Sequence, residues 1–418
     1  MGSFKVTILL LWVLFTSCSQ KLEFKVEAKT LSLPSEREIE AKLKILNKPA
    51  LKTIKSEDGD IIDCVDIYKQ PAFDHPALKD HTIQKIPDFL LEWQNSSSSQ
   101  VFQTWQKSGS CPEGTIPIRR IRKEDLLRAG SLDLFGRKPP IHFMNSTNTI
   151  NSNSHKANGS NAYVPENRSK SSLITVGYNY IGAEANINVW NPRVDLPNDF
   201  TTAQIWLKAG NGPQFFQSVE VGWMVNPKLY GDRATRLFAY WTTDSYKSTG
   251  CFDVTCSGFV HTGQVALGSA ITPISTPYGT QYEINVGIFW DQSGNWWFRV
   301  GHNNPVGYWP AKLFKPDGLS HSATSVEWGG QVYSPMVKKR PHTRTAMGSG
   351  DSIDSRWGTG CFMRNLRIKD YSQQLKYPES VSTRAEEEYC YNVFNEAKYG
   401  QEPTLFFGGP GQAPPYCP

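Results

Sequence analysis

The segments Val219-Glu-Val-Gly-Trp-Met-Val225 and Val326-Glu-Trp-Gly-Gly-Gln-Val332 decide the fold of this 418-residue chain. In both, apolar residues alternate with polar residues or glycine, which is the period of a strand with one buried face. Each strand therefore turns its valines and tryptophan inward and its acid or amide outward: Glu220 in the first, Glu327 and Gln331 in the second. Glycines beside these side chains leave room for another chain to approach the backbone.

Similar short runs recur along the C-terminal part of the chain, separated by turn residues and without helices between them. They cover residues 174–180, 203–208, 237–242, 259–262, 281–290, 295–302 and 361–369. Regular short strands of this kind predict an antiparallel β-sandwich over residues 173–418. The many aromatic residues, with 33 glycines and 27 prolines, also suit an all-β fold class.

The N-terminal region predicts a leader and a small α+β domain. Residues 1–20 combine Lys5, an apolar run and small residues, the pattern of a secretory signal peptide, and the run is shorter than the ~20 residues of a membrane span. We expect a secreted, extracellular protein with no membrane association after signal removal. In residues 21–144, a capping box at Ser35 and Glu38 predicts a helix over residues 36–46.

Residues 145–172 form a polar stretch of low complexity that cannot bury enough apolar area to fold. We interpret it as an exposed linker and as the place where the chain is cut. Three of the four glycosylation acceptors lie in it; the acceptors are Asn95, Asn145, Asn158 and Asn167.

Eight cysteines fit a secreted protein, and seven remain once Cys18 leaves with the signal. Their positions favour three pairs, although the sequence leaves other connectivities open. The expected disulfides are Cys64–Cys111, Cys251–Cys256 and Cys390–Cys417, with Cys361 unpaired.

Several kinds of function are not supported. A formal net charge of +5, with no basic-aromatic patch, does not indicate nucleic acid. The sequence lacks the motifs of zinc peptidases, serine hydrolases, aspartic peptidases and phosphate-binding loops. Cys361 with His342 is a weaker alternative to an inert strand cysteine.

Carboxylates remain as candidate acids and bases, and Glu220 is the best placed. Burial between valines would raise its pKa toward values useful for general acid-base work. The alternative is a structural glutamate bonded to a neighbouring Arg or Tyr.

The strand segments and several other motifs resemble the plant neprosin family. In the C-terminal part these are Val219-Glu-Val-Gly-Trp-Met-Val-Asn-Pro-Lys-Leu-Tyr-Gly-Asp232, Tyr240-Trp-Thr-Thr-Asp244, Gly307-Tyr-Trp-Pro310 and Val326-Glu-Trp-Gly-Gly330. In the N-terminal part, Asp58-Gly-Asp-Ile-Ile-Asp-Cys-Val65 and Cys111-Pro-Glu-Gly-Thr-Ile-Pro-Ile-Arg-Arg120 look like the family's activation domain. The resemblance implies a glutamic endopeptidase made as a zymogen, with a β-sandwich fold, cleavage after proline at acidic pH, and no metal or cofactor.

The resemblance also implies two catalytic glutamates. The first falls on Glu220, and the second, at the end of a Trp-Gly-Gly-Glu motif, falls on Gln331 in this chain. Glu327 is the alternative, but it lies roughly 13 Å from Gln331 along the strand, so only one of them can face Glu220. We favour Gln331, because a carboxamide can orient water and hydrogen-bond an oxyanion although it cannot act as an acid.

The resulting hypothesis has Glu220 as general base and Gln331 holding the water and polarising the scissile carbonyl. Four tryptophans are candidates to shape an apolar cleft for proline rings: Trp206, Trp223, Trp290 and Trp328. Trp223 and Trp328 lie on the strand face opposite the polar pair, so a place in the core is favoured for these two. The prodomain would act as an inhibitor, its basic cluster neutralising the acidic cleft at neutral pH and leaving as the carboxylates are protonated; a solvated basic loop is the open alternative. The cluster is Arg119, Arg120, Arg122 and Lys123.

Two non-catalytic functions remain as alternatives. One is a weakened or inactive member of the family that binds peptides or resides in the apoplast or cell wall. The other is a carbohydrate-binding sandwich, which would leave the long prosegment without a purpose.

Overall fold

The computed structural model describes residues 34–90, 102–141, 167–212 and 214–418. The predicted signal peptide and the acceptors Asn95, Asn145 and Asn158 lie outside these residues. Asn167 is half-buried. Within the described residues, no helix is long and apolar enough to cross a membrane.

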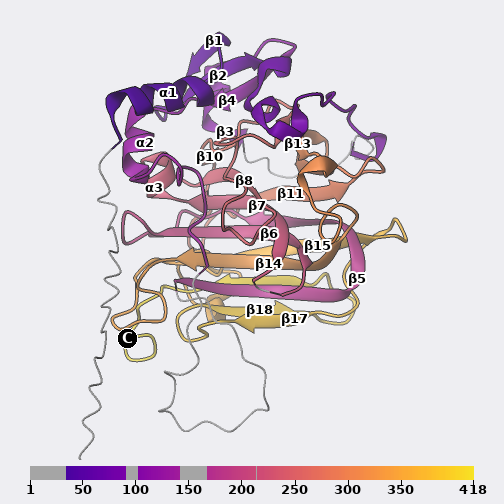
Figure 1. Cartoon of the computed structure of the whole chain (residues 1–418). Helices are drawn as coiled ribbons and strands as arrows, with labels where there is room; N and C mark the ends of the chain where they lie inside the picture. Colours follow the sequence, from indigo (N-terminus) through magenta and orange to yellow (C-terminus); the bar gives the residue numbers. More distant parts are fainter. Residues whose placement is uncertain (1–33, 91–101, 142–166, 213) are drawn as a thin grey trace, which may run out of the picture. The chain divides into compact units, whose positions relative to one another are not determined.

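The N-terminal part, indigo in Figure 1, is a small α+β unit. Its antiparallel sheet has the order β1-β2-β4. The predicted helix and its capping box are confirmed, since the Ser35 backbone N–H donates to Glu38 Oε2 at 2.7 Å. The elements are α1 (Glu36–Leu46), β1 (Ala50–Lys55), β2 (Ile61–Asp66), β3 (Phe102–Gln103), β4 (Thr115–Arg119) and α2 (Lys123–Ala129). Short 3-10 helices lie at Ile67–Lys69, Pro71–Asp74, Pro76–Leu78, Asp88–Leu90 and Thr104–Ser108.

The C-terminal part is built from antiparallel strands, which confirms the predicted fold class. They are β5 (Arg168–Asn188), β6 (Phe200–Gly210), β7 (Phe216–Val225), β8 (Arg236–Thr242), β9 (Val260–His261), β10 (Ile271–Thr272), β11 (Glu283–Trp290), β12 (Trp296–Val300), β13 (Asn304–Trp309), β14 (Ala323–Tyr333), β15 (Phe362–Asp370), β16 (Leu375–Lys376), β17 (Ser382–Ala385), β18 (Asn392–Glu396) and β19 (Thr404–Gly408). The helix α3 (Pro227–Tyr230) follows β7, and 3-10 helices lie at Ala311–Leu313 and Ile353–Ser355.

The long strand β5 connects the two layers of the sandwich. Its first half pairs with β14 and β17, and its second half pairs with β11 and β15. Gly177 lies between the halves with φ +107°, a conformation that favours glycine and allows the strand to bend. One layer therefore has the order β8-β7-β6-β14-β5, which can be followed from top to bottom in Figure 1. The other layer continues from β5 through β11, β12 and β13.

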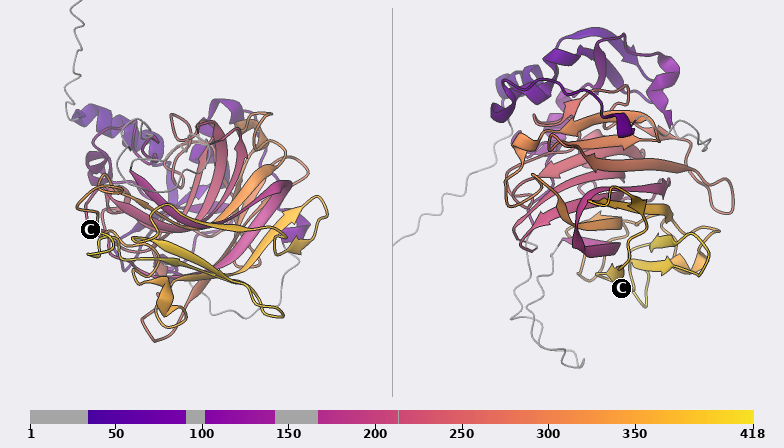
Figure 2. Two further views of the ribbon diagram at one scale, coloured as in Figure 1. Left: turned by 90° about the horizontal axis from the view of Figure 1, so that it is seen from below. Right: turned by 90° about the vertical axis from the view of Figure 1, so that its right-hand side faces the viewer.

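The predicted linker ends earlier than residue 172, because β5 already begins at Arg168. The polar serines at the start of this strand are buried: Ser169 pairs with β14, and Ser171 and Ser172 pair with β14 on one side and β17 on the other. Figure 2 shows the magenta β5 beside the yellow C-terminal strands. Composition suggested a linker because it did not reveal these two neighbouring strands.

The core lies between the layers, as the alternation predicted. Trp223 on β7 and Trp328 on β14 are fully buried. Their indole N–H groups donate across the core to the backbone of β5, at 3.0 Å to the Asn188 carbonyl and 3.2 Å to that of Glu184. These contacts fix which face of β7 and β14 is internal, and the opposite face carries the polar residues.

Three disulfides stabilise the chain, and they are the three pairs expected from the sequence: Cys64–Cys111, Cys251–Cys256 and Cys390–Cys417. Cys361 is free and buried. Its thiol contacts the Asn188 carbonyl, and burial raises its pKa well above the usual value. A thiol held in this state is not an activated nucleophile.

Candidate active site

The face of β6, β7 and β14 that points away from the core carries two acids and two amides. The strand register places Glu220 opposite Trp206, and Trp206 opposite Glu327, in one row across the sheet. Gln204 lies in the next row, two residues along β6, and Gln331 lies in the row beyond it, opposite Thr202. Since paired residues and every second residue share a face, all of these side chains project to the same side.

Glu220 is enclosed and accepts four hydrogen bonds. The Gln204 amide donates to Oε2 at 2.7 Å, and the Ser218 hydroxyl donates to Oε1 at 2.8 Å. Tyr246 donates its hydroxyl proton to Oε1, and the Lys138 ammonium donates to Oε2. Both partners of the Lys138–Glu220 ion pair have no exposed side-chain surface.

The pKa of Glu220 differs from the sequence-based expectation. Burial by itself raises the pKa, as predicted, but the Lys138 charge and the hydrogen bonds from Lys138, Tyr246 and Ser218 outweigh burial and lower it. The expectation of a raised pKa was therefore wrong for this state of the protein. Glu220 is held as a carboxylate whose charge is already compensated, which makes it a poor proton acceptor here.

Lys138 reaches Glu220 from the N-terminal part. It lies in the covering segment, residues 134–140, which runs over the polar face. The Phe252 N–H donates to the Gly136 carbonyl at 2.7 Å, and the Lys138 N–H donates to the Tyr240 hydroxyl at 3.3 Å. Gly136 has φ +71°, and a Cβ there would lie 1.9 Å from the Thr255 hydroxyl, so the close approach requires glycine.

Apolar packing holds the N-terminal part against the same face. One cluster of buried side chains combines residues from both parts of the chain: Ile39, Leu46, Ile121, Leu126, Ala129 and Phe135 pack with Phe200, Met224, Leu229, Tyr230, Phe238, Tyr240, Tyr246 and Phe252. A cavity of about 320 Å³ remains between the covering segment and residues near α3, among them Asn226 and Leu229. The polar face is therefore closed to a peptide while the N-terminal part is in place.

Glu327 is held by a different set of cations. Lys208 donates to Oε1 at 2.5 Å, and Lys170 donates to Oε2. Burial raises the pKa of Glu327, but the two lysines outweigh burial and lower it to about 2. Both lysines belong to the β-sandwich, on β5 and β6, and both lie near the Trp206 ring.

Gln331 is buried, and its side-chain oxygen has no hydrogen-bond partner within the described residues. The oxygen of Gln204 is in the same condition. Gln331 lies two strands and four positions from Glu220, roughly 10 Å across and 13 Å along the sheet, so Gln204 stands between them. The expectation that Gln331 faces Glu220 across a single water was therefore wrong for this state of the protein. Gln204 was not among the residues predicted from the sequence, although its alternation with Trp206 places both side chains on the same strand face.

The basic cluster of residues 119–123 does not reach the acid, which corrects the sequence-based expectation. These side chains bond instead to residues of the N-terminal part itself. Arg119 donates to Asp60 at 3.0 Å, Arg120 to Asp63 at 2.5 Å and Arg122 to the Gly59 carbonyl, all in or beside β2, and Lys123 donates to Glu36 of α1. The neutralising charge comes from Lys138, which no motif had indicated.

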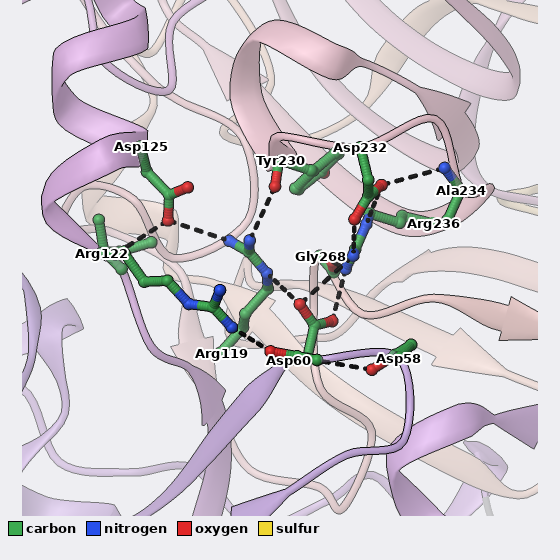
Figure 3. A network of polar contacts seen from close by, with 12 residues as sticks. Asp58, Asp60, Arg119, Arg122, Asp125, Tyr230, Asp232, Ala234, Arg236 and Gly268 are labelled. Carbon is green, nitrogen blue, oxygen red and sulfur yellow. Dashed lines mark hydrogen bonds and ion pairs between the residues drawn. The ribbon is translucent and has the colours of Figure 1, made fainter.

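Arg119 nevertheless contributes to a buried network that joins the two parts of the chain (Figure 3). Asp60, between β1 and β2, accepts from Arg119 Nε at 3.0 Å and from Arg236 Nη1 on β8 at 2.5 Å. Arg236 also pairs with Asp232, and Arg119 donates to the Tyr230 carbonyl at 3.2 Å. Burial raises the pKa of Asp60, but Arg236 and Arg119 outweigh it and lower the pKa.

His342 and Cys361 do not form a catalytic pair. The His342 ring pairs with Glu387 at 3.3 Å and lies beside Cys390 and Cys417. Those two sulfurs are bonded to each other, so they offer no thiolates for a metal.

Fold and site together define a β-sandwich whose buried carboxylate is covered by an N-terminal segment of the same chain. A family model for neprosin matches residues 197–410, about half of the chain, and a model for the neprosin activation peptide matches residues 53–163. The chain belongs to the neprosin family. Lys138 lies within the activation-peptide match and Glu220 within the neprosin match, which is the organisation of a peptidase zymogen.

Solved structures give only a distant likeness. A scytalido-glutamic peptidase with a transition state analog inhibitor has 10% identity and a TM-score of 0.31, covering 58% of this chain and 97% of that one. The β-porphyranase BpGH16B of the gut bacterium Bacteroides plebeius has 6% identity and a TM-score of 0.22, covering 56% and 63%. Likenesses at this level carry no argument about chemistry.

Proposed function

We propose that this protein is a secreted glutamic endopeptidase that cleaves peptides after proline at acidic pH once the N-terminal part is released. The observation that supports the proposal is the ion pair between Glu220 and Lys138. A cation from the β-sandwich itself would make Glu220 a structural residue. This cation belongs to the activation peptide, so the carboxylate becomes available when that segment leaves.

Glu220 is the proposed general base. Without Lys138 it keeps its bonds from Gln204, Ser218 and Tyr246, but it loses the charge that lowers its pKa most. It then takes a proton from a water that attacks the scissile carbonyl, and returns the proton to the leaving amine.

Gln331 is the proposed second polar residue of the site. It lies too far from Glu220 to hold the same water, so its amide would hydrogen-bond the peptide further along the sheet, and Gln204, whose amide already donates to Glu220, would orient the water. The buried oxygen of Gln331 without a partner favours this assignment, because such an atom requires a water or a ligand. Glu327 is the weaker alternative, since both of its oxygens are already held by lysines.

The test uses the full chain. It is incubated at acidic pH, and the N-terminus of each product is determined to find a cut between residues 145 and 167, before β5 begins at Arg168. Hydrolysis of a proline-containing peptide is compared with that of its alanine analogue. Glu220→Gln should lower the rate by about 10²–10⁴-fold, and Gln331→Leu by about 10²-fold.

Two outcomes would contradict the proposal. Hydrolysis that survives Glu220→Gln would exclude Glu220 as the base. A chain that loses its N-terminal part and then binds the peptide without cutting it, in both the parent and the variant, would favour the peptide-binding alternative.

A further inference from the structure

The surroundings of the Lys138 ammonium extend beyond its ion pair with Glu220. Three rings surround the nitrogen, with distances to their centroids of 4.7 Å for Tyr240, 5.0 Å for Tyr246 and 5.7 Å for Phe252. We call these three rings the aromatic cage. Aromatic faces attract a cation, and the attraction is strongest where water is excluded, as it is here.

The cage is made by the β-sandwich and not by the segment that it binds. All three rings lie within residues 197–410, the match to the neprosin family. They also pack against one another, with centroids 5.5 Å apart for Tyr240 and Tyr246 and 4.7 Å apart for Tyr240 and Phe252. The Cys251–Cys256 disulfide anchors the loop that carries Phe252. The ring–ring contacts and the disulfide lie within the β-sandwich, so they remain when the N-terminal part leaves.

The shape and charge of the cage select one type of side chain. Its base is a carboxylate, so a neutral group such as Met would leave Glu220 without its ion-pair partner, with the Arg168 guanidinium, 4.9 Å from the Tyr246 ring, as a neighbouring positive charge. The side chain that occupies the cage has an unbranched stem, and its ammonium is compact, with rings on three sides. A planar guanidinium needs several hydrogen-bond acceptors, whereas the ammonium is held here by the Glu220 carboxylate.

We propose that the aromatic cage with Glu220 is a binding site for a primary ammonium on an unbranched stem, and that in the released enzyme it takes a lysine side chain of a peptide. Such a peptide would repeat the contact made by Lys138, occupy the catalytic carboxylate and inhibit hydrolysis. Peptides with lysine at this position are therefore inhibitors and poor substrates. Only the identification of the ligand as a peptide rests on the proposed function.

The test is chemical rescue in the full chain. Lys138→Ala removes three methylene groups and the ammonium nitrogen, and n-propylammonium supplies the same atoms. The Tm at neutral pH is measured with n-propylammonium chloride, with 1-propanol, which has a similar shape and no charge, and with sodium chloride at equal ionic strength. Lys123→Ala is the matched control, because Lys123 pairs with Glu36 near the surface and faces no cage.

n-Propylammonium should raise the Tm of Lys138→Ala by several degrees and leave Lys123→Ala unchanged, because a ligand that binds only the native state stabilises it. Equal stabilisation by 1-propanol would show an apolar cavity without preference for a cation. No stabilisation by either compound would overturn the proposal. Should Lys138→Ala not fold alone, the same comparison is made on its refolding yield, where n-propylammonium must restore folding and 1-propanol must not.

A second measurement identifies the ligand as a peptide. Acid-treated full-length protein is assayed with capped Phe-Gly-Arg-Lys-Pro-Pro and with its norleucine analogue as inhibitors. The norleucine peptide should inhibit about tenfold more weakly. If no hydrolysis is found, the proposed function fails, but the thermal shifts still show whether the aromatic cage binds a primary ammonium. If the enzyme is active and both peptides inhibit it equally, the ammonium-binding proposal is wrong while the proposed function stands.

Discussion

Glu220 and Glu327 are two buried carboxylates in one row of the same sheet, on either side of Trp206, and they differ in the origin of their counter-ions. Lys138, which neutralises Glu220, belongs to the activation-peptide match. Lys170 and Lys208, which neutralise Glu327, belong to strands of the sandwich. Removing the N-terminal part would therefore take the ion-pair partner from Glu220, with Arg168 of β5 as a remaining positive charge near it, and would leave Glu327 paired.

The origin of the counter-ion distinguishes a carboxylate that stabilises the fold from one that can take part in catalysis. An acid whose partners stay in the same domain contributes to the folded state and offers no free proton acceptor. An acid whose partner can leave is stored in a stable form and becomes reactive on release.

The largest effect is expected for the permanent ion pairs. Glu327→Gln in the full chain leaves Lys170 and Lys208, which are only 18% and 17% exposed, without the buried carboxylate that they share, so the free energy of unfolding should fall by ~3 kcal/mol. Denaturant unfolding at neutral pH measures the loss. The triple variant Glu327→Gln, Lys170→Met, Lys208→Met removes the buried charges together and should recover much of it. A single variant as stable as the parent would show that Glu327 is not held as described.

The removable pair should show a change in pH dependence. In the parent, the pKa of Glu220 is lowered, so its contribution to stability is present above the unfolded value near 4.5 and is lost as the pH falls through the folded pKa. In Lys138→Met, burial dominates and raises the pKa, so the protonated form is favoured and stability is lost as the pH rises.

The variant should thus be less stable than the parent by ~3 kcal/mol at pH 7 and by much less near pH 4. Thermal unfolding across this interval measures the difference. A gap that does not change with pH would mean that the ion pair is not the source of the stabilisation.

A smaller effect is expected at the network that joins the two parts of the chain. Asp60→Asn removes the charge shared by Arg119 and Arg236 and should weaken the attachment of the N-terminal part by ~1.5–3 kcal/mol. The pKa of Asp60 is lowered, so its contribution is present at neutral pH and is lost as the pH falls below 3.8 through the folded value.

Protection of the covering segment against proteolysis, measured between pH 7 and pH 3, tests this prediction. Asp63→Asn is the matched control, because Asp63 pairs with Arg120 inside the small N-terminal sheet. If both variants lose protection equally, the network has no particular role in attachment.

Local signals were sufficient for most of the fold and for part of the site. The capping box at Ser35 predicted α1, and period-2 alternation predicted β7 and β14 with Trp223 and Trp328 in the core. Glu220 was found because its strand face could be read from the same alternation. These features depend on neighbours in sequence, which a single sequence shows.

Contacts between distant segments could not be predicted in this way. Lys138 and Glu220 are separated by 82 positions, and Lys138 stands in an irregular segment without periodicity. The lowered pKa of Glu220 follows from that contact, so burial alone gave the wrong direction. Likewise, the start of β5 was taken for linker, because its polar residues are paired by strands more than 150 positions away.

The smallest effect is expected for the basic cluster that the sequence had indicated as the inhibitor. Lys123→Ala breaks an ion pair with Glu36 whose two side chains are 42% and 63% exposed, and exposed pairs contribute only about 0–1 kcal/mol. The variant should keep the melting temperature of the parent within a few degrees and should release its N-terminal part at the same pH.

Autoprocessing followed by gel electrophoresis compares Lys123→Ala with Lys138→Met. The Lys138→Met variant should release its N-terminal part at higher pH, because Glu220 no longer holds a cation. If Lys123→Ala shifts the release more than Lys138→Met does, then diffuse charge of the cluster, and not the single buried lysine, restrains the acid.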